Sequence, residues 1–344
     1  MGDRVIARTL TFMGPRQVEV RDRVLLPPTP GQARVAARLS GISSGSELLV
    51  YRGQAPAGLA ADETLASLPG TLAFPLAYGY AAVGVVDDVG TSGDDHWIGR
   101  RIFAFQPHAS HFVADLADLH PIPDGVADDD AVFLANAETA VSLLHDGAPL
   151  AGERVAVWGQ GIVGLLTASL LARVPLERLV TIDRYAMRRQ ASLALGASAA
   201  LDPAQSDHPE ALRAALGQDG ADLTYELSGN PAALETALES TGYSGRVVLG
   251  SWYGTRPVSL DLGGTFHRSR IRILASQVSH LDPALTGRWT KARRLAFAWE
   301  WLARLQPSGW ITHRFELKRA TEAYALLDNH PDQALQVVLT FAGT

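Results

Sequence analysis

The chain has 344 residues, of which 47% are hydrophobic and 19% are charged, and its formal net charge is −6. This composition is typical of a folded globular protein, and the length favours two domains over a single core. The acidic balance argues against nucleic-acid or anionic-lipid binding, and every apolar run is broken well before the ~18 residues of a membrane span. Cysteine is absent, which excludes disulfides, thiolate nucleophiles and cysteine zinc sites. The N-terminus has no signal-peptide core, so we expect a cytoplasmic protein that acts on a small-molecule substrate and has neither nucleic acid nor membrane as a partner.

The first part of the chain, up to about residue 124, predicts short strands separated by turns. The clearest strands are residues 17–21, 33–39, 82–86 and 101–105. Glycine and proline residues between them are typical of the turns and bulges of a small β-rich barrel.

The second part alternates strands with helical segments rich in alanine and leucine. Strands are predicted at residues 154–158, 179–182, 222–226, 246–250 and 270–275. This alternation indicates right-handed crossovers and a parallel sheet. A helix over residues 291–305 and a terminal strand over 336–341 complete the predicted elements.

A glycine-rich loop follows the strand at 154–158. The glycines are Gly159, Gly161 and Gly164, and Ile162 and Val163 open the apolar helix that follows. This spacing allows a tight turn, close approach of the backbone to a pyrophosphate, and contact of helix with strand. The helix N-terminus then favours the negative charge of the phosphates. The sequence therefore predicts a dinucleotide-binding site.

The next strand suggests which dinucleotide binds. It ends in Asp183, nineteen residues after Gly164, where a ribose-binding carboxylate is expected. An aspartate accepts hydrogen bonds from a ribose 2′-hydroxyl and repels a 2′-phosphate, which favours NAD. Arg184 and Arg188 lie just beyond and soften that repulsion, so NADP stays possible, although the Arg188-Arg189 pair is also typical of a solvated helix face.

Five segments resemble, in order, motifs of the medium-chain dehydrogenase/reductase superfamily. Residues 119–126 resemble its inter-domain segment, 220–229 its fourth Rossmann strand, 245–250 the next strand, and 311–315 and 322–324 its C-terminal segment. The resemblance implies that Ser228, near the end of the first strand motif, and Ser251, directly after the second, help to bind the cofactor.

The resemblance also implies a fold and an assembly. The fold class is α/β: a GroES-like β-barrel domain over residues 1–124 and 278–344, and a Rossmann domain with a doubly wound parallel sheet over 125–277. The C-terminus returns to the first domain. A homodimer formed through the edge strand near 270–276 is expected on the same ground.

The chain departs from the zinc enzymes of this superfamily at their metal ligands. Their cysteine segment is replaced by residues 41–47, Gly-Ile-Ser-Ser-Gly-Ser-Glu, and their Gly-His-Glu segment by Gly79-Tyr80-Ala81. Hydroxyls and phenols do not replace thiolate and imidazole as zinc ligands at neutral pH. We therefore expect a zinc-independent member with no metal site. Residues 41–53 and the segment from 266–268 through 276–279 most resemble zinc-independent members, in the group that includes bacteriochlorophyllide hydroxyethyl dehydrogenase.

By resemblance, four residues are candidates for the proton chemistry, each with a structural alternative. Tyr80 donates a hydrogen bond to the developing alkoxide or fills the space of the metal. Ser46 relays a proton or caps a helix. Glu47 orients Ser46 or pairs with an arginine. Glu138 is an acid/base or caps the following helix.

The predicted function is hydride transfer between a secondary alcohol and a ketone, with NAD or NADP as cofactor. Reduction of an activated C=C bond, as in quinone and enoyl reductases, is the alternative reaction, and non-catalytic nucleotide binding is the alternative class. His108 and His111 lie three apart in a strand-like stretch and so point to opposite faces. They are therefore interpreted as ordinary surface or interface histidines.

Overall fold

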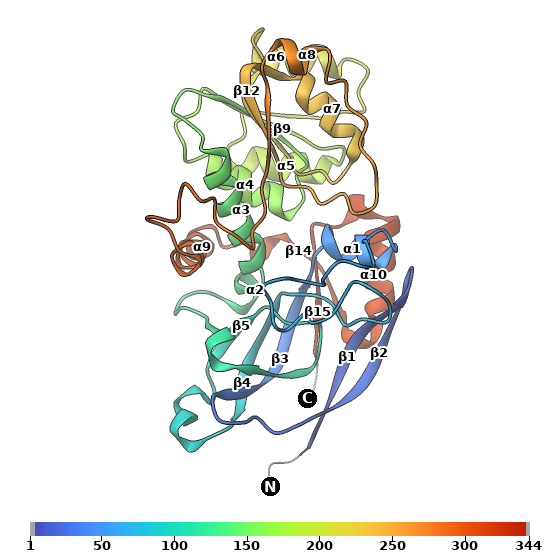
Figure 1. The fold of residues 1–344 in the computed structure, drawn as a ribbon, viewed down its shortest axis with the longest axis vertical. Coiled ribbons are helices and arrows are strands. Elements are labelled where there is room, and N and C mark those ends of the chain that lie inside the picture. Colours follow the sequence, from blue (N-terminus) through green and yellow to red (C-terminus); the bar gives the residue numbers. More distant parts are fainter. Residues whose placement is uncertain (1–3, 342–344) are drawn as a thin grey trace. The chain divides into compact units, whose positions relative to one another are not determined.

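The computed structural model describes residues 4–341 and contains two compact units (Figure 1). Unit 1 consists of residues 1–135 and 299–344, and unit 2 of residues 136–298. The sequence analysis predicted the boundaries between the two domains at 124/125 and 277/278. In the structure they fall inside α3 (Leu134–Gly147) and α9 (Lys291–Leu305). Within residues 4–341, no helix is long and apolar enough to span a membrane.

Unit 1 is built on antiparallel strands. Its larger sheet has the order β14-β15-β3-β4-β5-β7, with β6 also paired to β3, and β1 and β2 form a separate hairpin. Alternate residues of β3, Ala33, Val35 and Ala37, are buried, which is the period-two pattern of a strand over a core. The C-terminal strand β15 (red in Figure 1) pairs with β3 (blue), so both ends of the chain build this sheet. The elements are β1 (Val5–Gly14), β2 (Gln17–Leu25), β3 (Gln32–Ile42), α1 (Ser46–Tyr51), β4 (Ala82–Val89), β5 (Arg101–Ala104), β6 (His111–Asp115), β7 (His120–Pro121), α2 (Asp128–Ala131), β14 (Ile311–Glu316), α10 (Ala320–Asn329) and β15 (Gln336–Thr340), with 3-10 turns at Ser92–Trp97, Leu116–Asp118, Pro307–Trp310, Leu317–Arg319 and Pro331–Gln333.

Unit 2 is a six-stranded parallel sheet with the order β10-β9-β8-β11-β12-β13. In the central strand β8, Val155, Ala156 and Val157 are all fully buried, because helices cover both faces of such a sheet. The order reverses beside β8, where the chain crosses from one half of the sheet to the other. The elements are β8 (Arg154–Trp158), α4 (Ile162–Leu171), β9 (Arg178–Ile182), α5 (Ala186–Leu195), β10 (Ala199–Leu201), α6 (His208–Leu216), β11 (Ala221–Glu226), α7 (Pro231–Glu239), β12 (Thr241–Leu249), α8 (Thr265–Arg268) and β13 (Arg272–Ala275).

The predicted strands and helices are confirmed, although some of their bounds differ: the strand predicted at 270–275, for example, begins at Arg272. Strand β12 begins at Thr241 rather than at 246, because its first residues pair with β11 before a register shift between Ala221 and Leu223. Strand β10 was not among the predicted strands. It has only three residues, all half-buried, and so shows little hydrophobic pattern.

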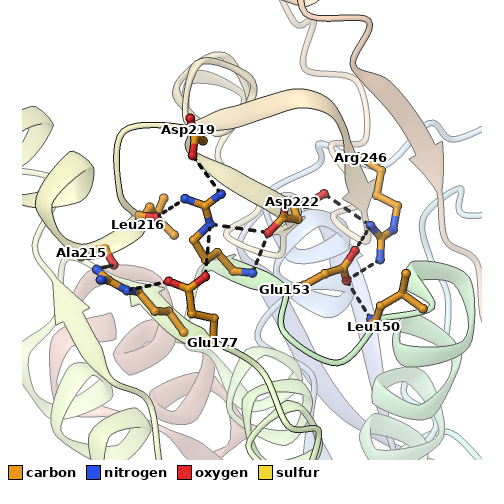
Figure 2. Close-up of polar contacts among 10 residues, drawn as sticks. Leu150, Glu153, Glu177, Ala215, Leu216, Asp219, Asp222 and Arg246 are labelled. Carbon is orange, nitrogen blue, oxygen red and sulfur yellow. Dashed lines mark hydrogen bonds and ion pairs between the residues drawn. The ribbon is translucent and has the colours of Figure 1, made fainter.

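The amino-terminal ends of the unit 2 strands carry a network of arginines and carboxylates (Figure 2). Arg246 of β12 binds both carboxylate oxygens of Glu153, at 2.7 and 2.9 Å. Arg154, the first residue of β8, lies 3.7 Å from the Asp222 carboxylate and 3.5 Å from that of Asp219. This network is at the opposite end of the strands from the glycine loop.

Candidate active site

The glycine loop, residues 159–164, joins β8 to α4. Gly159 has a φ of +89°, and a Cβ there would lie 2.5 Å from the Ser228 backbone. A Cβ on Gly164 would lie 2.0 Å from the carbonyl oxygen of Gly159. Neither position has room for a side chain, because the loop after β11 packs against Gly159 and the first turn of α4 packs against the glycine loop.

The second glycine of the loop is different, because a Cβ would meet almost nothing. The nearest atom to that Cβ is Arg188 Nη1, at 4.0 Å. Gly161 is the N-cap of α4 and provides no capping side chain. The amides of the first turn, which include Ile162 and Val163, have no intrahelical acceptor and are available to an anion. The loop therefore has the form of a pyrophosphate cradle.

Asp183 follows β9, and its carboxylate faces the glycine loop. Its Oδ2 accepts the Gln160 amide at 2.7 Å and its Oδ1 accepts the Tyr185 amide at 2.8 Å. The residue is 7% exposed. Each carboxylate oxygen has a second lone pair, so the two amide bonds leave capacity for a ribose hydroxyl.

The arginines after Asp183 are ordered against the protein. The guanidinium of Arg188 lies 3.9 Å from the Asp183 carboxylate, and Arg189 pairs with Asp202 at 3.0 Å. The Arg184 and Arg188 guanidinium groups lie 5.4 and 4.8 Å from the centre of the Tyr185 ring. The expectation of a solvated face for the Arg188-Arg189 pair is therefore wrong, since both side chains are mostly buried by their partners.

Ser228 and Ser251 lie in the loops after β11 and β12 and surround a buried carboxylate that the sequence did not single out. Glu226, fully buried at the end of β11, accepts hydrogen bonds from the Ser228 amide and hydroxyl on Oε1. Its Oε2 accepts the Tyr253 hydroxyl at 2.6 Å. The Ser251 hydroxyl accepts the Gly229 amide at 2.8 Å. The two serines thus shape the loops beside the glycine loop.

In unit 1, two serines hold a tyrosine. The Ser43 and Ser46 hydroxyls hydrogen-bond the phenol oxygen of Tyr80, and we call these three residues the Tyr80 cluster. Burial and the negative charge of Glu47 raise the pKa of Tyr80 to about 12, although the two serine hydrogen bonds act in the opposite direction. The phenol is therefore protonated at neutral pH and can donate a hydrogen bond. The helix-cap alternative for Ser46 is wrong, because α1 begins at Ser46 with Gly45 as its N-cap residue.

Glu47 is fully buried and lies at the centre of a second set of contacts, the Glu47 network of Ser40, Glu47, His108 and Tyr324. Its Oε2 accepts the Tyr324 hydroxyl and lies 2.9 Å from His108 Nε2. Its Oε1 accepts the Ser43 amide at 2.8 Å. The expected partners of Glu47, the Ser46 side chain or an arginine, are therefore wrong, since its partners are a histidine, a tyrosine and a backbone amide.

The interpretation of His108 as an ordinary surface or interface residue is also wrong. Its side chain is 0% exposed, and Nδ1 lies 2.6 Å from the Ser40 hydroxyl. His111, on the first position of β6, is half-buried and lies 3.2 Å from the Ser110 hydroxyl. The two rings have different partners, as their spacing predicts.

Glu138 belongs to unit 2 and lies within α3, five residues into the helix, so it does not cap it. Its Oε1 accepts hydrogen bonds from Arg294 at 2.7 and 3.1 Å, and the Arg294 side chain is 1% exposed. Arg294 also donates to the Ser142 hydroxyl and the Val278 carbonyl, each at 2.6 Å. The carboxylate is thus committed to a buried ion pair, which argues against the acid/base interpretation.

The donor groups in unit 1 do not fit zinc. By the resemblance, Ser43 and Tyr80 stand at the positions of two zinc ligands, and the Tyr80 phenol is hydrogen-bonded to the Ser43 and Ser46 side chains. Zinc is bound by thiolate, imidazole or carboxylate, and neutral hydroxyls are poor ligands. Among residues 4–341, no group of three or more histidine, aspartate or glutamate side chains is arranged to hold a metal.

The chain is similar to several known dehydrogenases. Residues 163–297 match the family model described as "Zinc-binding dehydrogenase". D-Guloside 3-dehydrogenase of Escherichia coli (strain K12) is 24% identical, over 94% of this chain and 96% of that protein. L-Threonine 3-dehydrogenase of Anaeromyxobacter sp. (strain K) is 30% identical, over 55% of this chain and 57% of that protein.

A solved structure shows the same fold. The short chain alcohol dehydrogenase (rspB) of E. coli CFT073, complexed with the cofactor NADH, has a TM-score of 0.78 and 20% identity, covering 98% of this chain and 99% of that one. The predicted fold class, a GroES-like β-barrel with a Rossmann domain, is confirmed by this likeness.

Proposed function

We propose that this chain, a dehydrogenase of the medium-chain dehydrogenase/reductase superfamily, interconverts a secondary alcohol and a ketone by hydride transfer with a nicotinamide cofactor and without zinc. The matched family model and the named relatives indicate the dehydrogenase class. The 3-dehydrogenase names of two relatives support oxidation of an alcohol rather than reduction of a C=C bond.

The cofactor part of this proposal rests on unit 2. The open N-terminus of α4 at Gly161 suits the pyrophosphate, and Asp183 suits the adenosine ribose. The carboxylate favours NAD over NADP, as the sequence predicts. When bound, the nicotinamide supplies the hydride acceptor or donor. The protein holds and orients it.

The carbonyl part rests on unit 1, and one observation carries it: the Tyr80 phenol is protonated and hydrogen-bonded to Ser43 and Ser46. By the resemblance, Tyr80 stands at the position of a zinc ligand. As hydride adds to a ketone carbon, negative charge builds on the oxygen and requires a donor. The Tyr80 hydroxyl donates to that oxygen and then transfers its proton, and the Ser43 and Ser46 hydroxyls stabilise the phenolate that is left.

The experiment that tests this proposal combines cofactor titration with metal analysis. The purified protein is titrated with NADH and with NADPH by fluorescence, and its zinc content is measured. It is then assayed with a panel of secondary alcohols and ketones before and after chelation. We expect binding of at least one nucleotide, NADH more tightly than NADPH, and turnover that chelators leave unchanged. Stoichiometric zinc with loss of activity on chelation, or no binding of either nucleotide, would overturn the proposal.

A further inference from the structure

His108 is a buried histidine that the proposed chemistry does not use. It lies between β5 and β6, its side chain is 0% exposed, and each ring nitrogen faces one buried group, Ser40 on one side and Glu47 on the other. A buried histidine with a polar partner on each nitrogen is fixed in orientation as well as in position.

The backbone that carries Tyr80 lies against the same imidazole. Gly79 has a φ of +118°, and a Cβ there would lie 2.7 Å from His108 Nε2 and 2.8 Å from Cδ2. The backbone of Gly79, the residue before Tyr80, therefore packs directly against the His108 ring, with no side chain between them. The ring therefore limits where the main chain next to Tyr80 can lie.

His108 also holds the carboxylate of Glu47, which contacts the Tyr80 cluster through the Ser43 amide. Glu47 Oε2 is shared by His108 and Tyr324, and Oε1 holds the Ser43 amide, so the carboxylate anchors one of the two serines of the Tyr80 cluster. The negative charge of Glu47 is among the causes that raise the pKa of Tyr80 and Tyr324. A carboxylate displaced from its place would change both the geometry and the acidity of the phenol.

The network is not a route to solvent. Ser40, Glu47 and His108 are each 0% exposed, and Tyr324 is also fully buried, so no member can exchange a proton with bulk water directly. This argues for a positional role rather than a relay.

We propose that His108 is a positioning residue of the candidate site, which fixes Glu47 and the Gly79–Tyr80 backbone so that the Tyr80 hydroxyl is held in one place. The effect on turnover rests on the proposed function, but the effect on Tyr80 does not. The role differs from simple core filling because it predicts a change at Tyr80 rather than only a loss of stability.

The test compares His108→Ala and His108→Gln with the matched control His111→Gln, which alters a half-buried histidine of the neighbouring strand. Glutamine at 108 retains an N–H for Glu47. The full chain is labelled with 3-fluorotyrosine, and the fluorine resonances of Tyr80 and Tyr324 are assigned by Tyr80→Phe and Tyr324→Phe. NADH affinity, kcat and KM are measured on the same proteins, with the best alcohol of the panel.

We expect His108→Ala to shift the Tyr80 and Tyr324 resonances and to lower kcat by about 100-fold with KM changed little, as for a misplaced donor. His108→Gln should restore part of the loss, and His111→Gln should change neither resonance nor kcat. NADH affinity should stay the same in all variants, because the glycine loop belongs to unit 2.

If His108→Ala does not fold, Ser40→Ala provides the same test, since it removes only the hydroxyl that faces Nδ1 and should move the Tyr80 resonance in the same direction by less. Unshifted resonances with normal kcat in a folded variant would overturn the positioning role. Shifted resonances in a protein that turns over no alcohol or ketone would instead overturn the proposed function and leave the positioning role standing.

Discussion

The proposed metal-free chemistry depends on the Tyr80 hydroxyl. Tyr80→Phe retains the ring and removes the O–H, so the developing alkoxide loses its donor while substrate packing is unchanged. We expect kcat to fall by about 100-fold or more with KM nearly constant, the behaviour of an interaction made in the transition state. Tyr243→Phe, which alters a tyrosine that is 70% exposed, is the control. A Tyr80→Phe enzyme with kcat within about twofold of wild type would show that another group donates the proton.

Under the proposed function, Asp183 sets the choice between NAD and NADP. Asp183→Ser removes the charge that repels a 2′-phosphate and leaves Arg188, 3.9 Å from that carboxylate, to attract one. We expect NADH to bind more weakly by roughly 10- to 100-fold, since hydrogen bonds to a charged group contribute about 1.5–3 kcal/mol, and NADPH to bind more tightly than in wild type. Fluorescence titration with both nucleotides measures the change.

Asp219→Ser, at the opposite end of the strands, is the control for that substitution and should leave both affinities as they are. A loss of affinity for NADH and NADPH to the same degree would show that Asp183 acts only by holding the Gln160 and Tyr185 amides.

Several residue-level roles depend on partners far away in the sequence, which is why the sequence could not predict them. Glu138 was a candidate acid/base in the sequence, but its partner Arg294 is 156 positions further on. Glu47 pairs with His108, 61 positions away, and with Tyr324, 277 positions away. Residue type and local spacing show that such a carboxylate is present, but only the fold decides whether its partner is an arginine, a histidine or a substrate.

At the scale of elements, the β8–loop–α4 segment could be predicted because each of its requirements is local. A side chain at Gly159 or Gly164 would collide with nearby backbone atoms, whereas Gly161 faces open space. By contrast, the start of β12 depends on its register with β11, which is set by another strand.

The glycine loop allows stability to be separated from binding. Gly164→Ala places a Cβ 2.0 Å from the Gly159 carbonyl oxygen, so α4 must move away from β8. We expect a loss of about 1–3 kcal/mol of unfolding free energy, typical of overpacking, together with weaker nucleotide binding. Gly161→Ala has room in the free protein and should cost less than about 1 kcal/mol, the range of a mild N-cap change.

Gly161→Ala should nevertheless weaken nucleotide binding as strongly as Gly164→Ala, because its methyl group enters the space of the pyrophosphate. Urea denaturation and NADH titration of the two variants, side by side, measure both quantities. Unchanged NADH affinity in Gly161→Ala would show that the pyrophosphate does not lie on this loop.

At the scale of the whole molecule, the two ends of the parallel sheet in unit 2 have different roles. Loops at the carboxyl ends of the strands carry the candidate cofactor residues, as is usual where the strand order of an open sheet reverses. The amino ends carry the arginine–carboxylate network of Figure 2. Outside the contacts drawn there, Arg246 also donates to the Gly147 carbonyl at 2.7 Å and to the Ala148 carbonyl at 3.0 Å. Arg246 therefore binds the end of α3 as well as Glu153.

This network makes a pH-dependent contribution to stability through Glu153. Burial acts to raise the pKa of Glu153, but the hydrogen bonds from Arg246 and the Leu150 amide outweigh it and hold the pKa below the usual 4.5. A carboxylate with a lowered folded-state pKa stabilises the fold above its unfolded-state pKa, and this stabilisation is lost as the pH falls through the folded-state value.

Glu153→Gln should therefore lower the unfolding free energy at pH 7 by about 1–3 kcal/mol, because it leaves the mostly buried Arg246 without its charged partner. The difference from wild type should shrink as the pH falls below 4.5, where Glu153 of the unfolded protein takes up a proton, and on through the lower pKa of the folded state. Urea denaturation at a series of pH values measures this. Glu177→Gln, which alters a half-exposed carboxylate 3.9 Å from Arg154, is the matched control and should change stability by less than about 0.5 kcal/mol. A Glu153→Gln deficit that stays constant down to acid pH would show that the contact acts through packing and not through charge.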